Sequence, residues 1–213
     1  MISVLYVAAN GAYFGTPGVD PWDAARDARF YAGPGPVVAH PPCARWGRYF
    51  FGGPSARVRR LLGDDGGCFA AALWAVRTFG GVLEHPEASS AWAWFGLQAP
   101  MRNGGWRRAD SFGGWTCCVE QGHYGHRARK ATWLYAVGTE LPDLEWGPSG
   151  AIIGDGETHD TDEARRRATK TGACQRMSKR ERLATPPAFR DALLAIANTA
   201  PGCDRAGNGE GEG

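Results

Sequence analysis

The sequence lacks the features that would direct a chain into or across a membrane. Near its start, no charged segment precedes an apolar run and a small-residue cleavage site. No apolar run approaches the ~18 residues that a bilayer crossing needs. We therefore expect a cytoplasmic protein with no membrane partner. Its six cysteines would stay reduced there, and their uneven spacing is not typical of a disulfide framework.

Strong net charge is also missing, because the formal net charge is only +2. That value excludes no class of partner. Arginine and lysine nevertheless gather at residues 102–108, 127–130, 165–170 and 176–182. These clusters predict either a surface that contacts phosphates or an ordinary solvated surface, and the sequence leaves both open.

Long regular elements are scarce, as 31 glycines and 14 prolines suggest. Short apolar runs predict strands over residues 2–9, 19–20, 36–39, 82–83, 116–121 and 132–137. Helical periodicity covers residues 65–79, and further helices begin near Ser178, which has capping-box spacing to Glu181, and near Thr185. This alternation predicts an α/β fold with a largely parallel sheet. We expect a single domain over residues 1–199 and a disordered tail over residues 200–213.

Three polar clusters follow predicted strands, at His40–Cys43, Glu84–Pro86 and His123–Lys130. In open α/β sheets, active sites form at the carboxyl ends of the strands. We therefore expect the three clusters to meet in one site.

Cys43 is the candidate nucleophile of that site. Pro41 and Pro42 stiffen the loop before it, and Arg45 or Arg48 could favour the thiolate, which is the reactive form. The alternative is a buried structural cysteine, but such a residue is more typical of the middle of an apolar element.

Glu84 can accept a hydrogen bond from an amino group and, when protonated, donate one to a ring nitrogen. It could equally be a surface carboxylate. His85, the next residue, could orient a ligand or simply line the loop.

The third cluster is rich in donors for phosphate or for a base edge. Arg127 and Arg129 lie two residues apart, so on an extended segment they point the same way. A solvated basic loop is the alternative. The residues that could form a zinc site instead are Cys117, Cys118, His123 and His126. Their spacing does not match structural zinc sites, and neighbouring cysteines on a strand face opposite ways, so we assign no metal ligand.

Four segments resemble motifs of the DNA cytosine-C5 methyltransferases, and they occur in that family's order. Pro41-Pro42-Cys43 resembles the Pro-Pro-Cys motif, and Leu83-Glu84-His85-Pro86 looks like the Glu-Asn-Val motif. Residues 122–138 are similar to the Tyr-Gly-x-Pro-Gln-x-Arg-x-Arg segment with its apolar strand, and residues 176–184 echo an Arg-x-Leu-Thr-x-Arg-Glu segment. Small phage-encoded proteins with a His-Pro-Pro-Cys motif form the most similar group, and host cytoplasm would then be the location.

The resemblance implies a Rossmann-like methyltransferase core, DNA as partner and S-adenosylmethionine as methyl donor. A flipped-out cytosine would be attacked at C6 by Cys43, and a methyl or related one-carbon group would pass to C5. Glu84 would hold N3 and the amino group, while Arg127 or Arg129 would support the covalent intermediate. The other residues assigned to substrate or DNA are Pro42, Arg45, His85, His126 and Lys130.

The sequence departs from the family at its start, which predicts a core reduced at the N-terminus. Asn10-Gly11 and the rest of the loop to Gly18 stand in place of the Phe-x-Gly-x-Gly-Gly loop that wraps the cofactor, and Asp20 is the candidate ribose ligand. No target-recognition domain fits between residues 139 and 175, so specificity would need a separate protein or a very short recognition segment. Two alternatives stay open: a non-catalytic relic that binds DNA or protein, and a cysteine-dependent enzyme acting on free pyrimidine nucleotides.

Overall fold

The computed structural model describes residues 1–53, 56–151, 161, 163, 166–167 and 177–201. The tail expected over residues 200–213 falls outside this description beyond residue 201, as does most of the basic cluster at 165–170. Within the described ranges, no helix has both the length and the apolar character that a membrane crossing requires.

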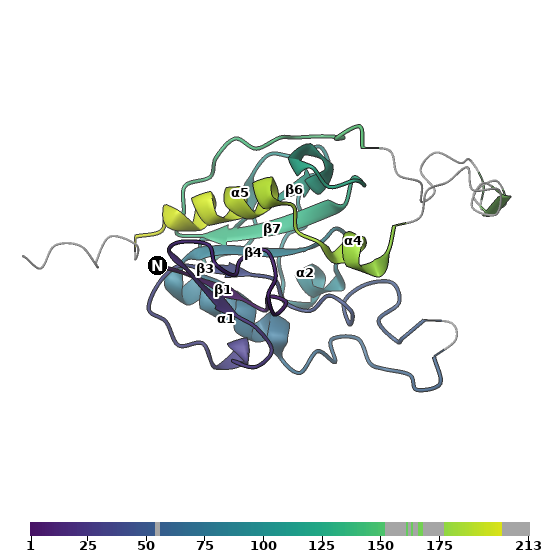
Figure 1. The fold of residues 1–213 in the computed structure, drawn as a ribbon, viewed down its shortest axis with the longest axis horizontal. Helices are drawn as coiled ribbons and strands as arrows, with labels where there is room; N and C mark the ends of the chain where they lie inside the picture. The colour runs from purple at the N-terminus through teal and green to yellow at the C-terminus, as the bar shows by residue number, and fades with distance from the viewer. Residues whose placement is uncertain (54–55, 152–160, 162, 164–165, 168–176, 202–213) are drawn as a thin grey trace, which may run out of the picture.

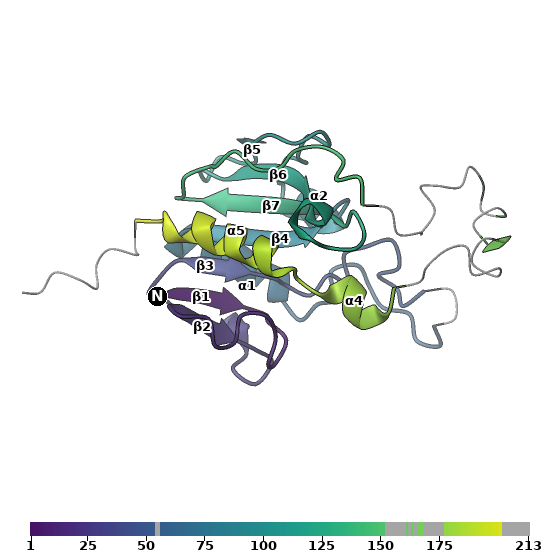
Figure 2. The same cartoon turned by 45° about the horizontal axis from the view of Figure 1, so that its top comes forward.

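Seven strands of the described chain form one sheet, in the order β2-β1-β3-β4-β7-β6-β5 (Figure 2). The strands are β1 (Ile2–Leu5), β2 (Val19–Trp22), β3 (Val37–Ala39), β4 (Gly81–Pro86), β5 (Arg107–Arg108), β6 (Trp115–Glu120) and β7 (Ala131–Val137). The helices are α1 (Cys68–Phe79), α2 (Ser90–Trp94), α4 (Lys179–Leu183) and α5 (Pro187–Asn198), with 3-10 turns η1 (Ala28–Phe30) and η2 (Gln121–Tyr124).

The predicted α/β class is confirmed, but the expectation of a largely parallel sheet is wrong. Strands β2, β1, β3 and β4 pair in parallel, whereas β7, β6 and β5 add to the sheet through three antiparallel pairings. The physical reason is connection length. Residues 121–130 between β6 and β7 are too few for the crossover that a parallel pair requires, so the chain reverses direction.

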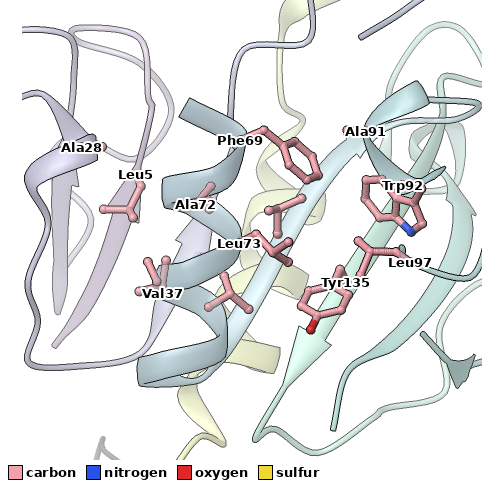
Figure 3. Packing of buried hydrophobic residues seen from close by; sticks show 14 of the residues in the cluster. Leu5, Ala28, Val37, Phe69, Ala72, Leu73, Ala91, Trp92, Leu97 and Tyr135 are labelled. Atoms are coloured by element: carbon pink, nitrogen blue, oxygen red, sulfur yellow. The ribbon is translucent and has the colours of Figure 1, made fainter. Parts of the chain in front are cut away.

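Helices cover both faces of the sheet, with α1 on one side and α5 on the other (Figure 1). Successive residues of a strand face opposite sides. Leu5 and Val37 therefore pack in the cluster beneath α1, together with Phe69 of that helix, as Figure 3 shows. Val4 and Val38 pack in the cluster beneath α5. The three layers leave the strand ends accessible at the edges of the sheet.

Several predicted boundaries differ from the observed ones. The strand expected over residues 2–9 ends at Leu5, because Tyr6 takes a left-handed conformation with φ of 63°. The capping box of Ser178 and Glu181 is confirmed at the start of α4. The segment between the predicted strands at residues 82–83 and 116–121 contains α2 and β5, which the sequence pattern does not predict.

Gly81, the first residue of β4, illustrates how closely the parallel strands are packed. Its φ is +123°, and a Cβ at this position would lie 1.9 Å from the carbonyl oxygen of Val37 on β3. Because that neighbour is backbone within a sheet, it cannot move aside without breaking the strand pairing.

We predict that Gly81→Ala lowers the free energy of unfolding by about 3 kcal/mol, through this clash and the unfavourable φ. Gly96→Ala is the matched control, since Gly96 also has a positive φ of +68° but open space around it. It should cost only about 1 kcal/mol. Urea denaturation measures both, and equal losses would contradict the packing described for β3 and β4.

Candidate active site

Polar side chains gather where β3 and β4 end, at the carboxyl edge of the parallel strands. The end of β4 pairs with the start of β7, with Pro86 opposite Thr132, so the segment that joins β6 to β7 reaches the same edge. The chain passes from β1 to β2 on one side of β1 and later to β3 on the other. Ligands bind beside such a reversal of strand order in open α/β sheets. This edge is therefore the candidate site.

The loop that carries Cys43 is held in place by buried residues before and after the cysteine. Pro41 before it is buried, and Trp46 after it is 2% exposed and donates its backbone N–H to the carbonyl of Cys43. The Trp46 indole N–H donates to Asp65 at 2.8 Å, which ties the loop to the segment that leads into α1. Pro42 is exposed and the Cys43 side chain is half-buried, so the thiol lies at the surface of a rigid loop.

A chain of hydrogen bonds joins two loops to strand β4 at that edge. His40 Nδ1 lies 2.9 Å from Glu84 Oε2, and His40 Nε2 lies 2.8 Å from the hydroxyl of Tyr13. When His40 Nδ1–H donates to Glu84, Nε2 can accept from Tyr13. Tyr13 is buried in the loop after β1, so this chain runs from β1 through β3 to β4.

Gln121 completes the surroundings of Glu84 from the end of β6. Its Nε2 donates to Thr132 Oγ1 at 3.0 Å and reaches Glu84 Oε1 at 3.4 Å. The side chain is 1% exposed, and its Oε1 has no hydrogen-bond partner among the described residues. An unpaired buried acceptor is costly, so this oxygen is a candidate contact for a ligand donor.

The charge state of Glu84 follows from these contacts. Burial alone would raise its pKa, but the hydrogen bond from His40 and the charges of His40 and Lys130 bring that pKa below its ordinary value. Its side chain is 15% exposed, so the ionised carboxylate is close to the surface of the site.

Lys130 is the cation of this cluster. Its backbone has a left-handed φ of 46°, and its Nζ donates to the carbonyl of Ala184 at the end of α4. Burial lowers the pKa of Lys130, while the negative charges of Glu84 and Cys43 oppose the shift. The structure therefore brings Lys130 together with Cys43 and Glu84.

The Cys43 thiol is protonated at neutral pH. Burial and then the charge of Glu84 raise its pKa above the ordinary 9.0, while a backbone hydrogen bond and the charge of Lys130 act in the opposite direction. Arg45, which we expected to favour the thiolate, donates to the carbonyl of Phe50 instead. Its nearest contact is thus within the loop that follows Cys43.

Arg127 and Arg129 have carboxylate partners outside the Cys43 cluster. Arg127 is exposed and forms an ion pair with Glu181 of α4, and Arg129 Nε lies 4.0 Å from Glu120 Oε2. His126 is buried, with Nδ1 accepting from the N–H of Ala128 and Nε2 near the carbonyl of Glu181. These contacts fix the segment before β7 against α4, and so position Lys130.

His85 lies under the site rather than at its surface. It is 1% exposed and packs between Phe69 and Trp92 on the α1 side of the sheet. Burial lowers its pKa to about 4, against the charge of Glu84 and the nearby carbonyl of Pro42. Neither ring nitrogen of His85 has a hydrogen-bond partner among the described residues. A neutral His85 thus supports the Pro41–Cys43 loop from below.

The residues expected to hold S-adenosylmethionine have other partners or lie at the surface. Asp20 lies opposite Ser3, two residues back from the carboxyl end of β2, and its carboxylate binds Arg26 and the Trp22 indole. Asn10 is exposed, and the backbone N–H of Gly11 is already bonded within its own turn. No helix joins β1 to β2 over the fully described residues 6–18, so no helix N-terminus is present there to bind the cofactor.

The zinc alternative finds no support either. No cluster of three or more potential metal ligands occurs within the described part of the chain. Cys117 faces the α5 side of β6, and Cys118 faces the other side, where it is registered with Trp133.

The sequence interpretation did not assign roles to Tyr13, His40 and Gln121. His40 and Gln121 each follow a strand directly, so the same strand-end rule could have found both. Nothing in the glycine-rich loop around Tyr13 indicates that its hydroxyl reaches a residue of another strand.

Comparisons of the chain with protein-family models, curated proteins and solved structures found no match in any of the three. The relation to cytosine-C5 methyltransferases thus remains a prediction that depends on the motifs and on the cluster at the strand ends.

We predict opposite effects of two substitutions on the reactivity of Cys43. Glu84→Gln removes a negative charge and so lowers the pKa of the thiol, whereas Lys130→Met removes a positive charge and raises it. Alkylation of Cys43 by iodoacetamide at pH 8 should become faster in the first variant and slower in the second. Each change should be about three- to tenfold, since one pKa unit alters the thiolate fraction about tenfold.

Peptide mass spectrometry would follow Cys43 separately from the other cysteines. Cys68 on α1 serves as internal control, because it is also half-buried but its pKa responds to Asp65 rather than to Glu84 or Lys130. Rates that change in the same direction in both variants would contradict the electrostatic coupling.

Proposed function

We propose that this chain modifies cytosine in DNA, through a covalent bond between the Cys43 sulfur and ring carbon C6, and that a methyl or related one-carbon group then passes to C5. The observation that carries the proposal is the cluster of Cys43, Glu84 and Lys130 at the carboxyl edge of β3 and β4. A nucleophile, a carboxylate and a cation that are close enough to shift one another's pKa values are the groups that addition to a pyrimidine ring uses.

The addition step can be written with these groups. The Cys43 thiolate forms the S–C6 bond, the electron pair of the C5–C6 double bond moves toward N3, and N3 takes a proton from Glu84. This leaves a C4–C5 double bond whose C5 is nucleophilic. Glu84 must therefore be protonated when cytosine is bound, although it is ionised in the free site.

His40 is placed to help with that proton. Its Nδ1 lies 2.9 Å from Glu84 Oε2, and we assign the base to Oε1, which has only a long contact of 3.4 Å from Gln121 Nε2 among the hydrogen bonds of the described residues. A protonated His40 can pass its proton to Glu84 as Glu84 gives one to N3. Lys130 compensates the negative charge that the thiolate and the carboxylate bring to the same site.

The identity of the one-carbon donor is separate from this argument. S-adenosylmethionine is the donor that the resemblance implies, but the placement of Asp20, Asn10 and Gly11 does not fit it, and we derive no step through it. Sequence specificity is proposed to come from a separate protein, because the described residues show no second domain beside the sheet.

The experiment is covalent trapping on duplex DNA that contains 5-fluorocytosine, with and without S-adenosylmethionine. Fluorine at C5 blocks the elimination that would release the enzyme, so a completed transfer leaves a protein–DNA adduct that survives denaturing electrophoresis. We expect an adduct that is lost in Cys43→Ser, and an adduct that forms only with the cofactor would identify S-adenosylmethionine as the donor.

Glu84→Gln provides a sharper control for the same assay. This variant should trap DNA at least about a hundredfold more slowly, since it cannot protonate N3, although its thiol reacts faster with iodoacetamide. Arg108→Gln, on the distant edge strand β5, should trap like the unchanged protein. No adduct, together with no binding of S-adenosylmethionine by calorimetry, would contradict the proposal and favour a non-catalytic DNA-binding protein.

A further inference from the structure

A second surface lies beside Cys43 and has no role in the chemistry described above. We name it the arginine loop and define it as residues 44–53 and 56–62. It carries five arginines and no acidic residue, and the arginines are Arg45, Arg48, Arg57, Arg59 and Arg60. Arg45 and Arg48 are named from the sequence, but the loop is not identified there as a basic cluster, because its charges are separated by apolar residues rather than gathered in one run.

Most of this charge is exposed and not neutralised. Arg48, Arg57, Arg59 and Arg60 are all exposed, and Arg45 donates to a carbonyl of the loop itself. None of the five forms an ion pair with a carboxylate of the described residues. A positive surface of this kind attracts a polyanion.

Aromatic side chains accompany the arginines. The Arg59 guanidinium lies 4.7 Å from the ring centroid of Phe51, and that of Arg48 lies 5.6 Å from the ring centroid of Tyr49. Tyr49 is 56% exposed and Leu61 is 77% exposed, although burial of such side chains would be favourable. Exposed aromatic rings beside arginines are the arrangement on which unpaired bases stack.

We propose that the arginine loop binds single-stranded DNA and holds it across Cys43. The described residues of the loop contain no helix or strand that could enter a groove of a duplex, which argues against duplex recognition. Guanidinium planes and aromatic rings instead suit a strand whose bases are accessible. The inference rests on the proposed function for its choice of DNA. An unpaired target base would also enter the site without the cost of flipping it out of a stack.

The way in which the arginine loop is anchored to the core supports the proposal that it holds a strand beside Cys43. Trp46 anchors the start of the loop in the core against Phe69 and Phe95, and its carbonyl accepts the N–H of Ser90. The bound strand would therefore lie at a fixed distance from Cys43, which a loop without such an anchor could not ensure.

The test measures binding of the full chain to a fluorescein-labelled 20-nucleotide DNA strand and to its duplex, by fluorescence anisotropy over a series of NaCl concentrations. We expect the single strand to bind at least about tenfold more tightly than the duplex. The triple variant Arg57→Gln, Arg59→Gln, Arg60→Gln should bind it about tenfold or more weakly, with a slope of log affinity against log salt that is smaller by about 2. Tyr49→Ala should weaken binding at least about fivefold, through lost stacking.

A matched triple variant removes the same charge elsewhere. Arg102→Gln, Arg107→Gln, Arg108→Gln changes three exposed arginines in and before β5, the outermost strand of the sheet. It should bind the single strand within about twofold of the unchanged protein. An equal loss in the two triple variants, tighter binding of the duplex, or tighter binding of an RNA strand of the same sequence would each overturn the inference. Unchanged thermal melting of both variants excludes unfolding as the cause.

The outcome is distinguishable from failure of the proposed function. Cys43→Ser leaves the arginine loop intact and should bind the single strand like the unchanged protein. Binding without any trapped adduct would leave the inference standing and contradict the enzyme. Trapping on duplex DNA, without tighter binding of the single strand, would support the enzyme and contradict the inference about the arginine loop.

Discussion

The hydrogen bond between His40 and Glu84 is the interaction on which the candidate site depends. It joins the loop after β3 to the residue of β4 that follows the β3–β4 pairing, over 2.9 Å. Without it, burial would favour the neutral form of Glu84, and the carboxylate would have no fixed orientation. Tyr13 and Gln121 extend the same network to the loops after β1 and β6. These three contacts together connect four segments of the chain that lie far apart in the sequence.

The same contact sets the electrostatic balance around Cys43. An ionised Glu84 raises the pKa of the thiol, and Lys130 partly offsets this effect. The free site therefore keeps its nucleophile protonated, which protects a half-exposed thiol from oxidation. Protonation of Glu84 by way of His40 removes the negative charge beside the thiol. In this account, the event that prepares the acid also favours the thiolate.

The sequence predicts where strands end better than it predicts which strands pair and which side chains meet at those ends. Short β-branched runs bounded by prolines and glycines placed β3, β4 and β7 correctly, because burial of a strand leaves a strong local pattern. The antiparallel half of the sheet could not be predicted in this way, since it depends on the length and path of connections. Cys43 and Glu84 were identified from their places after strands. The sequence predicts that the His123–Lys130 cluster reaches the same site. It does not predict that Lys130, rather than Arg127 or Arg129, is the cation near Cys43 and Glu84, because that depends on the left-handed backbone of Lys130 and on its hydrogen bond to the end of α4.

The arginine loop was missed for a similar reason. Its charge is interleaved with apolar residues. It differs from an ordinary solvated turn by its exposed aromatic side chain and because its arginines have no carboxylate partner among the residues that the structure describes. Arg127 and Arg129 show the opposite case, because they form a conspicuous cluster in the sequence but have Glu181 and Glu120 as partners. Local charge density is thus a poor guide to which cations are available for a ligand.

The central claim is that Cys43 adds to C6 of cytosine, and exchange of the C5 hydrogen tests it most directly. Addition at C6 makes C5 basic, so a C5 proton can be gained and another lost to water without any one-carbon donor. DNA that carries tritium at C5 of cytosine should release it to water in the presence of the unchanged protein, and not with Cys43→Ser. Release that is equal in the two proteins, or absent from both over a range of pH that ionises the thiol, would contradict the account.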